Sequence, residues 1–173
     1  MLIRPTTLAD IPAIAEIYDD AVRTGTASFE LDPPGTGEMT RRYDALVAGG
    51  YPYFVAVDED GTLLGYAYVA AFRPRIAYRF TVENSVYVAP AAHKRGVGKA
   101  LMTALIAECE QRGYRQMIAV IGDSANAGSI ALHRACGFRD IGILASTGLK
   151  FGRWLDTVLM QRDLGTGDRT PAA

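Results

Sequence analysis

The sequence is poor in cysteine, carries little net charge and lacks long apolar runs. Its two cysteines, Cys109 and Cys136, fall among apolar residues of predicted helices, which argues against a disulfide scaffold and favours buried free thiols in a reducing compartment. A formal net charge of −1 gives no overall field that would attract nucleic acid or an anionic membrane. No apolar stretch approaches the roughly 20 residues that span a bilayer, and the first residues lack the apolar core of a signal peptide. We therefore expect a cytoplasmic protein with no nucleic-acid or membrane partner.

The length of 173 residues suits one domain with a substantial core. Hydrophobic residues make up 49% of the chain and charged residues 21%, which is typical of a globular protein. We expect a single domain over residues 1–163. The last residues, 164–173, are rich in Gly, Thr, Pro and Ala, and this composition predicts a disordered tail.

The spacing of apolar residues predicts the element order β-α-α-β-β-β-α-β-α-β-β. Thr7 is the expected N-cap of the first helix, with Asp10 as the acid of a capping box. Strands are expected over residues 2–4, 53–57, 63–71, 81–88, 116–121, 138–143 and 155–162. Helices are expected from residue 8 to before Gly25, over 38–48, from the glycine turn at 96–98 to before Gly113, and over 127–136. Because several strands follow each other directly, we predict a mixed α+β sheet, with one right-handed strand–helix–strand crossover whose strands are parallel.

Residues 83–101 carry the most informative pattern. They run from an apolar strand through a loop with glycines and basic residues into a strong helix, an order that builds a phosphate site at the helix N-terminus. A Walker A loop is excluded, because His93 stands at its first glycine and Ala100 follows Gly98-Lys99. A dinucleotide fingerprint is excluded too, because Leu101 stands where its third glycine belongs.

The remaining pattern, Arg95-x-x-Gly98-x-Ala100, resembles the acetyl-CoA pyrophosphate loop of the Gcn5-related N-acetyltransferase (GNAT) family. Residues 126–138 (NAGSIALHRACGF) resemble the second motif of the same family, at the expected separation. The resemblance covers residues 2–163. It implies a central twisted mixed sheet of about seven strands flanked by about four helices, with acetyl-CoA as co-substrate and no metal.

A closer resemblance is to the phosphinothricin acetyltransferase subfamily. It rests on residues 81–88 (TVENSVYV), 129–133 (SIALH) and 148–156 (GLKFGRWLD). This resemblance implies direct transfer of an acetyl group, in a ternary complex, to the α-amine of phosphinothricin, methionine sulfoximine or methionine sulfone. It also implies a homodimer, to which the exposed apolar residues of the last strands, Trp154 included, would contribute.

Glu83 is the candidate general base. In the predicted strand it shares one face with Ser85 and Tyr87, whereas the valines point to the other face. A carboxylate near an amine nucleophile takes its proton, an effect worth roughly 10²–10⁴-fold in rate. By the residues alone, a sheet-face Glu paired to a Lys or Arg is the alternative.

The resemblance implies that this strand splays from its parallel neighbour at a bulge, so that backbone groups of Val86 and Val88 face the pantetheine arm. The Val88 N–H would then donate to the thioester oxygen, a contact worth roughly 3–4 kcal/mol. The residues expected to bind the cofactor are Val86, Tyr87, Val88, Lys94, Arg95, Gly96, Val97, Gly98, Lys99, Ala100, Asn126 and Ser129. For Asn126 and Ser129, helix N-capping is an alternative role; for the basic residues, a solvated surface position is the alternative.

His133 stands where many relatives place a Tyr that acts as general acid for the leaving thiolate. His can donate a proton near neutral pH, and a core His bonded to the backbone is the alternative. A dyad with Cys136 is rejected, because nothing nearby lowers the pKa of the thiol and the family transfers the acyl group directly.

The loop at residues 72–80 is the candidate for acceptor binding. Arg73, Arg75 and Arg79 alternate with aromatic residues, Tyr78 among them, and guanidinium groups bind a carboxylate or phosphinate in a bidentate manner. Solvation or a salt-bridge network of a dimer is the alternative. Nucleic acid is disfavoured by the net charge and the short patch. Phe29, in a segment that resembles the subfamily's other substrate loop, would form an apolar wall.

Three functions remain open at this point. The first is an N-acetyltransferase for a small amine substrate with a carboxylate. The second keeps the cofactor but acetylates a protein N-terminus or another amine. The third is a non-catalytic acyl-CoA-binding domain, against which the presence of both Glu83 and His133 argues.

Overall fold

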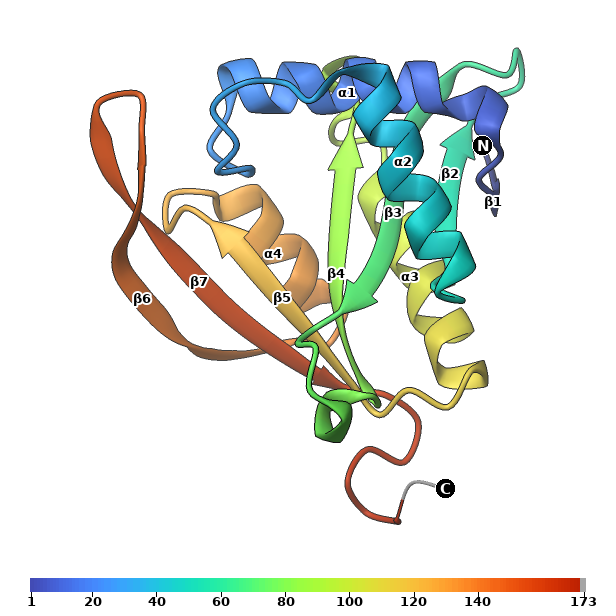
Figure 1. Ribbon diagram of the computed structural model, residues 1–173, viewed down its shortest axis with the longest axis vertical. Coiled ribbons are helices and arrows are strands. Elements are labelled where there is room, and N and C mark those ends of the chain that lie inside the picture. The colour runs from blue at the N-terminus through green and yellow to red at the C-terminus, as the bar shows by residue number, and fades with distance from the viewer. Residues whose placement is uncertain (172–173) are drawn as a thin grey trace.

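A seven-stranded sheet with the order β1-β2-β3-β4-β5-β7-β6 runs through the computed structural model, which describes residues 1–171 (Figure 1). The strands are β1 Leu2–Pro5, β2 Tyr53–Val57, β3 Leu63–Ala71, β4 Thr81–Val88, β5 Gln116–Gly122, β6 Arg139–Lys150 and β7 Arg153–Asp163. The α-helices are α1 Ile11–Thr24, α2 Gly35–Ala48, α3 Val97–Gln111 and α4 Ala127–Ala135. Short 3-10 helices occupy Leu8–Asp10, Ile76–Tyr78 and Pro90–Ala92. The predicted element order and mixed sheet are confirmed.

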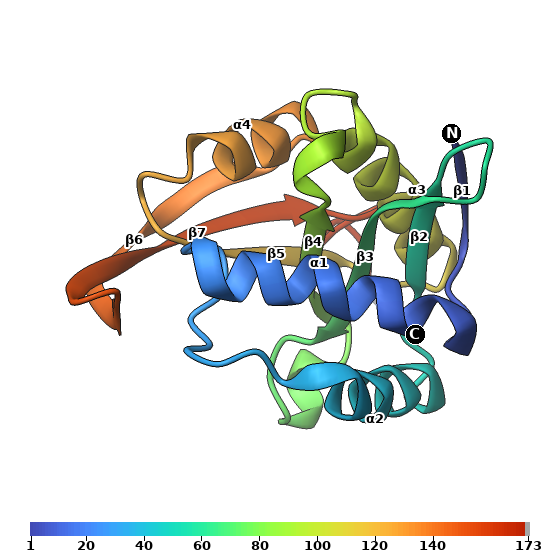
Figure 2. The same ribbon diagram turned by 90° about the horizontal axis from the view of Figure 1, so that it is seen from above.

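Helices cover both faces of the sheet. Figure 2 shows α3 and α4 on one face and α1 and α2 on the other. Alternate side chains of the central strands supply the two apolar cores. Ala67 and Val82 pack with α3, whereas Val55 and Tyr66 pack with α1 and α2. The sheet is therefore buried on both sides at β3 and β4, where the predicted site residues lie.

The strand–helix–strand unit β4-α3-β5 has the expected geometry. β4 and β5 are parallel, and the other neighbouring pairs in the sheet are antiparallel. Gly96 precedes α3 with φ of 79°, and Gly113 follows it with φ of 82°. Both lie in the left-handed region that glycine enters without steric cost, so the two glycines mark the helix ends.

Several elements extend beyond their predicted bounds, and β6 does so by the most residues. β6 continues to Lys150 rather than ending at residue 143, and its register with β7 is irregular near Gly142 and between Leu144 and Gly148. Because β6 is exposed along most of its length, its apolar residues give no inside–outside alternation from which its length follows. α2 begins at Gly35 rather than at residue 38. The residue before it, Pro34, already has helical dihedrals, with φ of −73° and ψ of −18°, so its fixed φ favours the early start despite the glycines in the first turn.

The tail also differs from its prediction. Residues 164–171 form turns that pack against the end of the sheet, with Leu164 buried and its N–H bonded to the Arg115 carbonyl. The Arg115 guanidinium bonds to Thr166 and Thr170. The remainder of the predicted disordered segment, residues 172–173, lies outside the described residues. Among residues 1–171 no helix is long and apolar enough to cross a membrane.

The start of the chain is held by a charge network around Asp10. Its carboxylate accepts from the Thr7 N–H at 2.8 Å, as the predicted capping box requires, and pairs with the Arg4 guanidinium at 2.7 Å. The hydrogen bonds from Arg4 lower the pKa of Asp10 to about 2. A carboxyl whose pKa is lower in the folded state stabilises the fold above its unfolded pKa, and this contribution disappears as the pH falls through the folded pKa.

We predict that Asp10→Asn lowers the free energy of unfolding at pH 7 by about 2 kcal/mol, because about 1.4 kcal/mol corresponds to each unit of pKa difference. The difference from wild type should shrink between about pH 4 and pH 2. Urea unfolding of both proteins across this range measures it. Asp32→Asn at an exposed position is the control, and a difference that persists unchanged at pH 2 would contradict the assignment.

Candidate active site

The site is built around a gap between β4 and β5. The two strands pair only from Thr81 to Asn84 on β4 and from Gln116 to Ala119 on β5. Beyond this point β4 keeps β3 as its partner and β5 keeps β7, so the two diverge (Figure 1). The register between β3 and β4 runs without a shift, so the gap opens without the bulge that the resemblance implied.

Peptide groups of Val86 and Val88 face this gap. On the opposite edge of β4, the Ala89 N–H donates to the Leu64 carbonyl at 2.9 Å. Successive residues of a strand present their peptide groups to alternate edges, so Val86 and Val88 direct theirs to the edge that β5 has left. His93 Nε2 lies 3.0 Å from the Val88 carbonyl and fixes the end of the strand. The gap therefore offers backbone donors and acceptors to an extended ligand.

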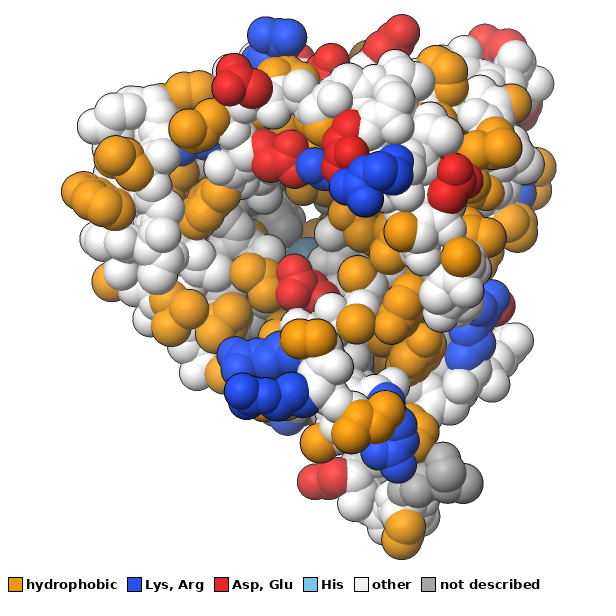
Figure 3. Space-filling model, in the orientation of Figure 1, with side chains coloured by type: hydrophobic (Ala, Val, Ile, Leu, Met, Phe, Trp, Pro, Cys, Tyr) orange, Lys and Arg blue, Asp and Glu red, His pale blue; other side chains and the backbone are white. Residues whose placement is uncertain are grey.

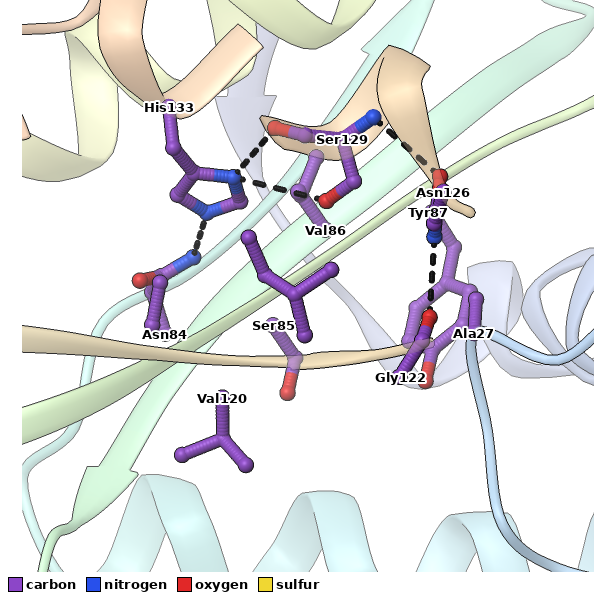
Figure 4. Close-up of a pocket in the computed structure, with 12 residues that line it drawn as sticks. Ala27, Asn84, Ser85, Val86, Tyr87, Val120, Gly122, Asn126, Ser129 and His133 are labelled. Atoms are coloured by element: carbon purple, nitrogen blue, oxygen red, sulfur yellow. Dashed lines mark hydrogen bonds between the residues drawn. The ribbon is translucent and has the colours of Figure 1, made fainter. Parts of the chain in front are cut away.

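A pocket opens into the gap (Figure 4). Figure 3 shows the corresponding hollow in the molecular surface, with acidic and basic side chains around it. Its lining comes from β4, β5, α4, the loop before α4 and the segment between α1 and α2: Ala27, Asn84, Ser85, Val86, Tyr87, Ala119, Val120, Ile121, Gly122, Asn126, Ser129 and His133. Of the predicted site residues, the pocket brings together Val86, Tyr87, Asn126, Ser129 and His133. Glu83 and Val88 lie on the same strand but are not part of this lining.

Glu83 lies on the strand just before the gap and is half-buried. Burial is the only cause that raises the pKa of its carboxyl. Within residues 1–171 no cation offsets this burial, so the alternative of a Glu held by a Lys or Arg finds no support. Burial raises the pKa of the neighbouring Tyr68, and the Glu83 charge adds a smaller increase. An unpaired, partly desolvated carboxylate is suited to accept a proton.

Asn126 and Ser129 organise the start of α4. The Asn126 Oδ1 accepts from the Ser129 N–H at 3.2 Å, which is the predicted N-cap. The Asn126 Nδ2 donates to the Gly122 carbonyl at 3.1 Å, so the same side chain ties the helix to the end of β5 (Figure 4).

His133 is buried and bonded through both ring nitrogens (Figure 4). Its Nδ1 lies 2.8 Å from the Ser129 carbonyl, which can only accept, so Nδ1 carries the hydrogen. Its Nε2 lies 2.9 Å from the Asn84 amide nitrogen and accepts from it. Burial lowers the pKa of His133. In this arrangement the ring is neutral and links α4 to the last paired residue of β4.

The loop before α3 presents backbone donors. Lys94 and Gly96 have φ of 62° and 79°, and the first bond within the helix runs from the Ala100 N–H to the Gly96 carbonyl at 3.0 Å. The N–H groups of the first turn precede that bond and have no partner within the helix. A Cβ at Gly98 would lie 3.0 Å from the Leu132 side chain, so glycine there lets α3 and α4 approach closely. These features fit a phosphate group.

The arginine loop lies outside the pocket lining. The Arg73 guanidinium stacks over Phe72 and Tyr78, with 5.1 and 5.7 Å to the ring centroids. The Arg79 guanidinium lies 4.4 Å from the centroid of Phe80. Arg75 is exposed. Aromatic rings thus hold two of the three arginines, and the role of this loop in acceptor binding stays a prediction.

The chain matches known proteins along nearly its whole length. Residues 14–138 match the Acetyltransferase (GNAT) family. The chain belongs to this family. It is 57% identical over 161 residues to a phosphinothricin N-acetyltransferase of Alcaligenes faecalis, covering 93% of this chain and 81% of the relative. It is 43% identical to the L-methionine sulfoximine/L-methionine sulfone acetyltransferase of Pseudomonas paraeruginosa, covering 94% of each.

The fold agrees with solved GNAT structures. A GNAT superfamily phosphinothricin acetyltransferase from Sinorhizobium meliloti, in complex with AcCoA, has a TM-score of 0.96 and 49% identity, covering 99% of this chain and 92% of that one. The predicted family, subfamily resemblance and fold are confirmed, and this GNAT protein is an acyltransferase. Among residues 1–171 there is no cluster of His, Cys, Asp and Glu that could hold a metal ion.

Sequence reasoning did not single out Asn84 and His93, which both form hydrogen bonds in the site. Asn84 follows Glu83 in an apolar strand, and its polar side chain at a core-facing position was the signal that it would need a buried partner. His93 lies in the loop before α3, and its bond to Val88 depends on how that loop folds back.

We predict that His133 is the Nδ1–H tautomer and titrates below the ordinary value of 6.5, because burial disfavours its cation. ¹⁵N chemical shifts of the imidazole, followed against pH, give both the tautomer and the midpoint. Asn84→Ala, which removes the donor to Nε2, is the control and should alter the Nε2 shift. A hydrogen on Nε2 at neutral pH, or a midpoint above 6.5, would contradict the arrangement.

Proposed function

We propose that this GNAT protein transfers the acetyl group of acetyl-CoA to the α-amine of a small amino acid or analogue of the phosphinothricin, methionine sulfoximine or methionine sulfone type. The observation that carries the proposal is the position of Glu83. Among the residues that the structure describes this carboxylate has no cation partner, and the next residues of its strand present peptide groups that β5 does not pair with. The names of the similar enzymes support the acceptor class.

The residues present fit acetyl-CoA. Backbone groups of residues 94–100 would hold its pyrophosphate at the start of α3, with basic side chains alongside. Val86 and Val88 would pair with the pantetheine arm, and the Asn126 amide stands at the opposite wall of the gap. When bound, acetyl-CoA supplies an activated thioester carbonyl.

Glu83 and Val88 are the groups that act on the reaction. The amine attacks the acetyl carbon only when it is neutral, and Glu83 takes the proton that the amine loses as the amide bond forms. The Val88 N–H stabilises the charge that develops on the carbonyl oxygen. The C–S bond breaks and CoA leaves as a thiolate, which takes up one proton to become the thiol. Glu83 gives up the proton that it took from the amine, so no proton is gained or lost overall. An acid role for His133 stays a prediction, and it would require the bond from Asn84 to Nε2 to be replaced.

Arg73, Arg75 and Arg79, with Tyr78, form the proposed anchor for the carboxylate of the acceptor, and Phe29 forms part of its apolar wall. Stacking on Phe72 and Tyr78 supports a fixed direction for Arg73. Guanidinium groups favour a carboxylate and disfavour a polycationic acceptor by like charge.

We also propose a cytoplasmic homodimer. The β6–β7 hairpin carries large exposed apolar side chains, which we call the hairpin patch: Ile141, Ile143, Leu144, Leu149, Phe151 and Trp154. Exposed apolar residues gathered in this way are typical of protein–protein interfaces. Both cysteines are free thiols, which supports a reducing compartment.

We predict that Glu83→Gln lowers kcat by roughly 10²–10⁴-fold, because the amide cannot accept the proton. In wild type, kcat/KM should fall on the acid side with a midpoint above the ordinary Glu value of 4.5, and this limb should disappear in the variant. Release of the CoA thiol, measured with methionine sulfone, methionine sulfoximine and phosphinothricin, gives the rates. Unchanged turnover in Glu83→Gln, or no turnover of any small amine by wild type, would contradict the proposal.

We predict that Trp154→Glu shifts the protein from dimer to monomer, because a carboxylate is placed in the middle of the hairpin patch, where Trp154 is 64% exposed. Sedimentation equilibrium measures the mass. Leu8→Glu, at an exposed apolar position far from the hairpin, is the control. A wild-type protein that sediments as a monomer would contradict the dimer.

A further inference from the structure

Lys150 is a buried cation that the proposed reaction does not use. It ends β6 and is 2% exposed, although the strand before it is exposed almost throughout. It belongs to residues 148–156, which carry part of the subfamily resemblance but have no function in the site described above. Burying an ammonium group is costly, so its partners indicate what it does.

The partner of Lys150 is a backbone group of the segment between α1 and α2. Its Nζ donates to the Ser28 carbonyl at 2.7 Å. The Glu30 carboxylate lies near enough for its charge to offset part of the burial of Lys150. The Lys150 ammonium also lies 5.0 Å from the centroid of Phe151. The cation thus joins the β6–β7 hairpin to residues 26–30, which we call the acceptor segment.

A second contact fastens the same segment. Phe29 is flanked by Gly122 at the end of β5 and Gly148 on β6. A Cβ built on Gly122 would lie 2.5 Å from the Phe29 ring, and one built on Gly148 would lie 2.4 Å from it. Only glycine leaves room for the ring at these two positions. The hairpin therefore receives the aromatic ring at Gly148 and holds the preceding carbonyl through Lys150.

The acceptor segment borders the pocket. Ala27 lines it together with Tyr87 and Gly122. The Ser28 hydroxyl shares a hydrogen bond of 2.9 Å with the Tyr18 hydroxyl, and the Tyr18 ring meets the edge of Tyr87 at 5.1 Å between centroids. A shift of this segment would move one wall of the pocket without touching the loop before α3.

We propose that Lys150 is a positioning residue that holds the acceptor segment against the pocket and so sets the affinity for the acceptor amino acid. The inference rests on the proposed function for the identity of the ligand. The contact between Lys150 and the acceptor segment does not depend on the proposed function. It also gives a function to residues 148–150: the glycine accommodates Phe29 and the lysine fixes the backbone beside it.

The test is Lys150→Met, which keeps the length of the side chain and removes the ammonium group. KM for methionine sulfone should rise about tenfold, since a charge-assisted hydrogen bond is lost. KM for acetyl-CoA should stay within twofold, because the loop before α3, which would hold the pyrophosphate, does not line the pocket that the segment borders. Hydrogen exchange of residues 26–30, followed by mass spectrometry without any ligand, should speed up in the variant.

Three further variants separate positioning from general stability. Lys150→Gln retains an N–H donor and should recover part of the acceptor KM. Arg139→Met removes a charge from the other end of β6, where Arg139 pairs with Asp163, and should leave both KM values unchanged. Gly148→Ala displaces Phe29 by a second route, and its effect combined with Lys150→Met should be smaller than the product of the two, because both act through one segment.

The proposal is overturned if Lys150→Met leaves the acceptor KM and the exchange of residues 26–30 unchanged. It is also overturned if both KM values rise equally, which indicates general loosening. If Lys150→Met does not fold, Lys150→Gln and Gly148→Ala provide the same two readouts. A wild-type protein that acetylates no acceptor would refute the proposed function, whereas the exchange measurement would still decide whether Lys150 holds the segment.

Discussion

The parallel pairing between β4 and β5 stops at Asn84 and Ala119, and the whole site depends on this interruption. Each strand keeps one partner on its outer side, so the sheet stays intact while its centre opens. In an uninterrupted sheet the peptide groups of Val86 and Val88 would be used by the β5 ladder. The interruption leaves them for a ligand, and the pocket forms where β5 has moved away.

The elements around the gap are tied to its two sides by polar side chains. His133 links α4 to Asn84 at the point where pairing ends, and Asn126 links the start of the same helix to Gly122 on β5. Each of these bonds satisfies a group that would otherwise be buried without a partner. These two bonds hold α4 across the gap. With one end fixed to β4 and the other to β5, the helix can keep the two strands apart where no hydrogen bonds join them.

In the proposed reaction, different parts of the fold serve the two substrates. The glycine turn and the first turn of α3 offer a positive helix end and backbone donors, which suit a phosphate. The acceptor side is assembled from segments far apart in sequence: the stretch around Phe29, the strand carrying Glu83 and the hairpin carrying Lys150. This division explains why variants on the hairpin are expected to affect one KM and leave the other unchanged.

The bounds of the elements with strong hydrophobic periodicity were predicted well from the local sequence. The strands at β2 to β5 and the ends of α3 follow from alternation and from glycines whose φ is positive, both of which are short-range effects. The length of β6 and the turns of residues 164–171 were not predicted. The length of β6 is set by its pairing with β7, and the turns of residues 164–171 are held by Arg115. Local composition does not predict either contact, because the partners are distant in sequence.

Some features of the site likewise follow from the local sequence, and others follow only from tertiary packing. The sequence by itself determined the phosphate loop, the cofactor motifs and the alternation that separates Glu83 from the valines, because these depend on residue type and spacing along one segment. The tertiary structure alone decided that Glu83 has no cation partner within residues 1–171, that Asn84 bonds His133 and that Lys150 reaches Ser28. Those facts depend on which side chains the packing brings within hydrogen-bond distance, and spacing along the chain does not encode that distance.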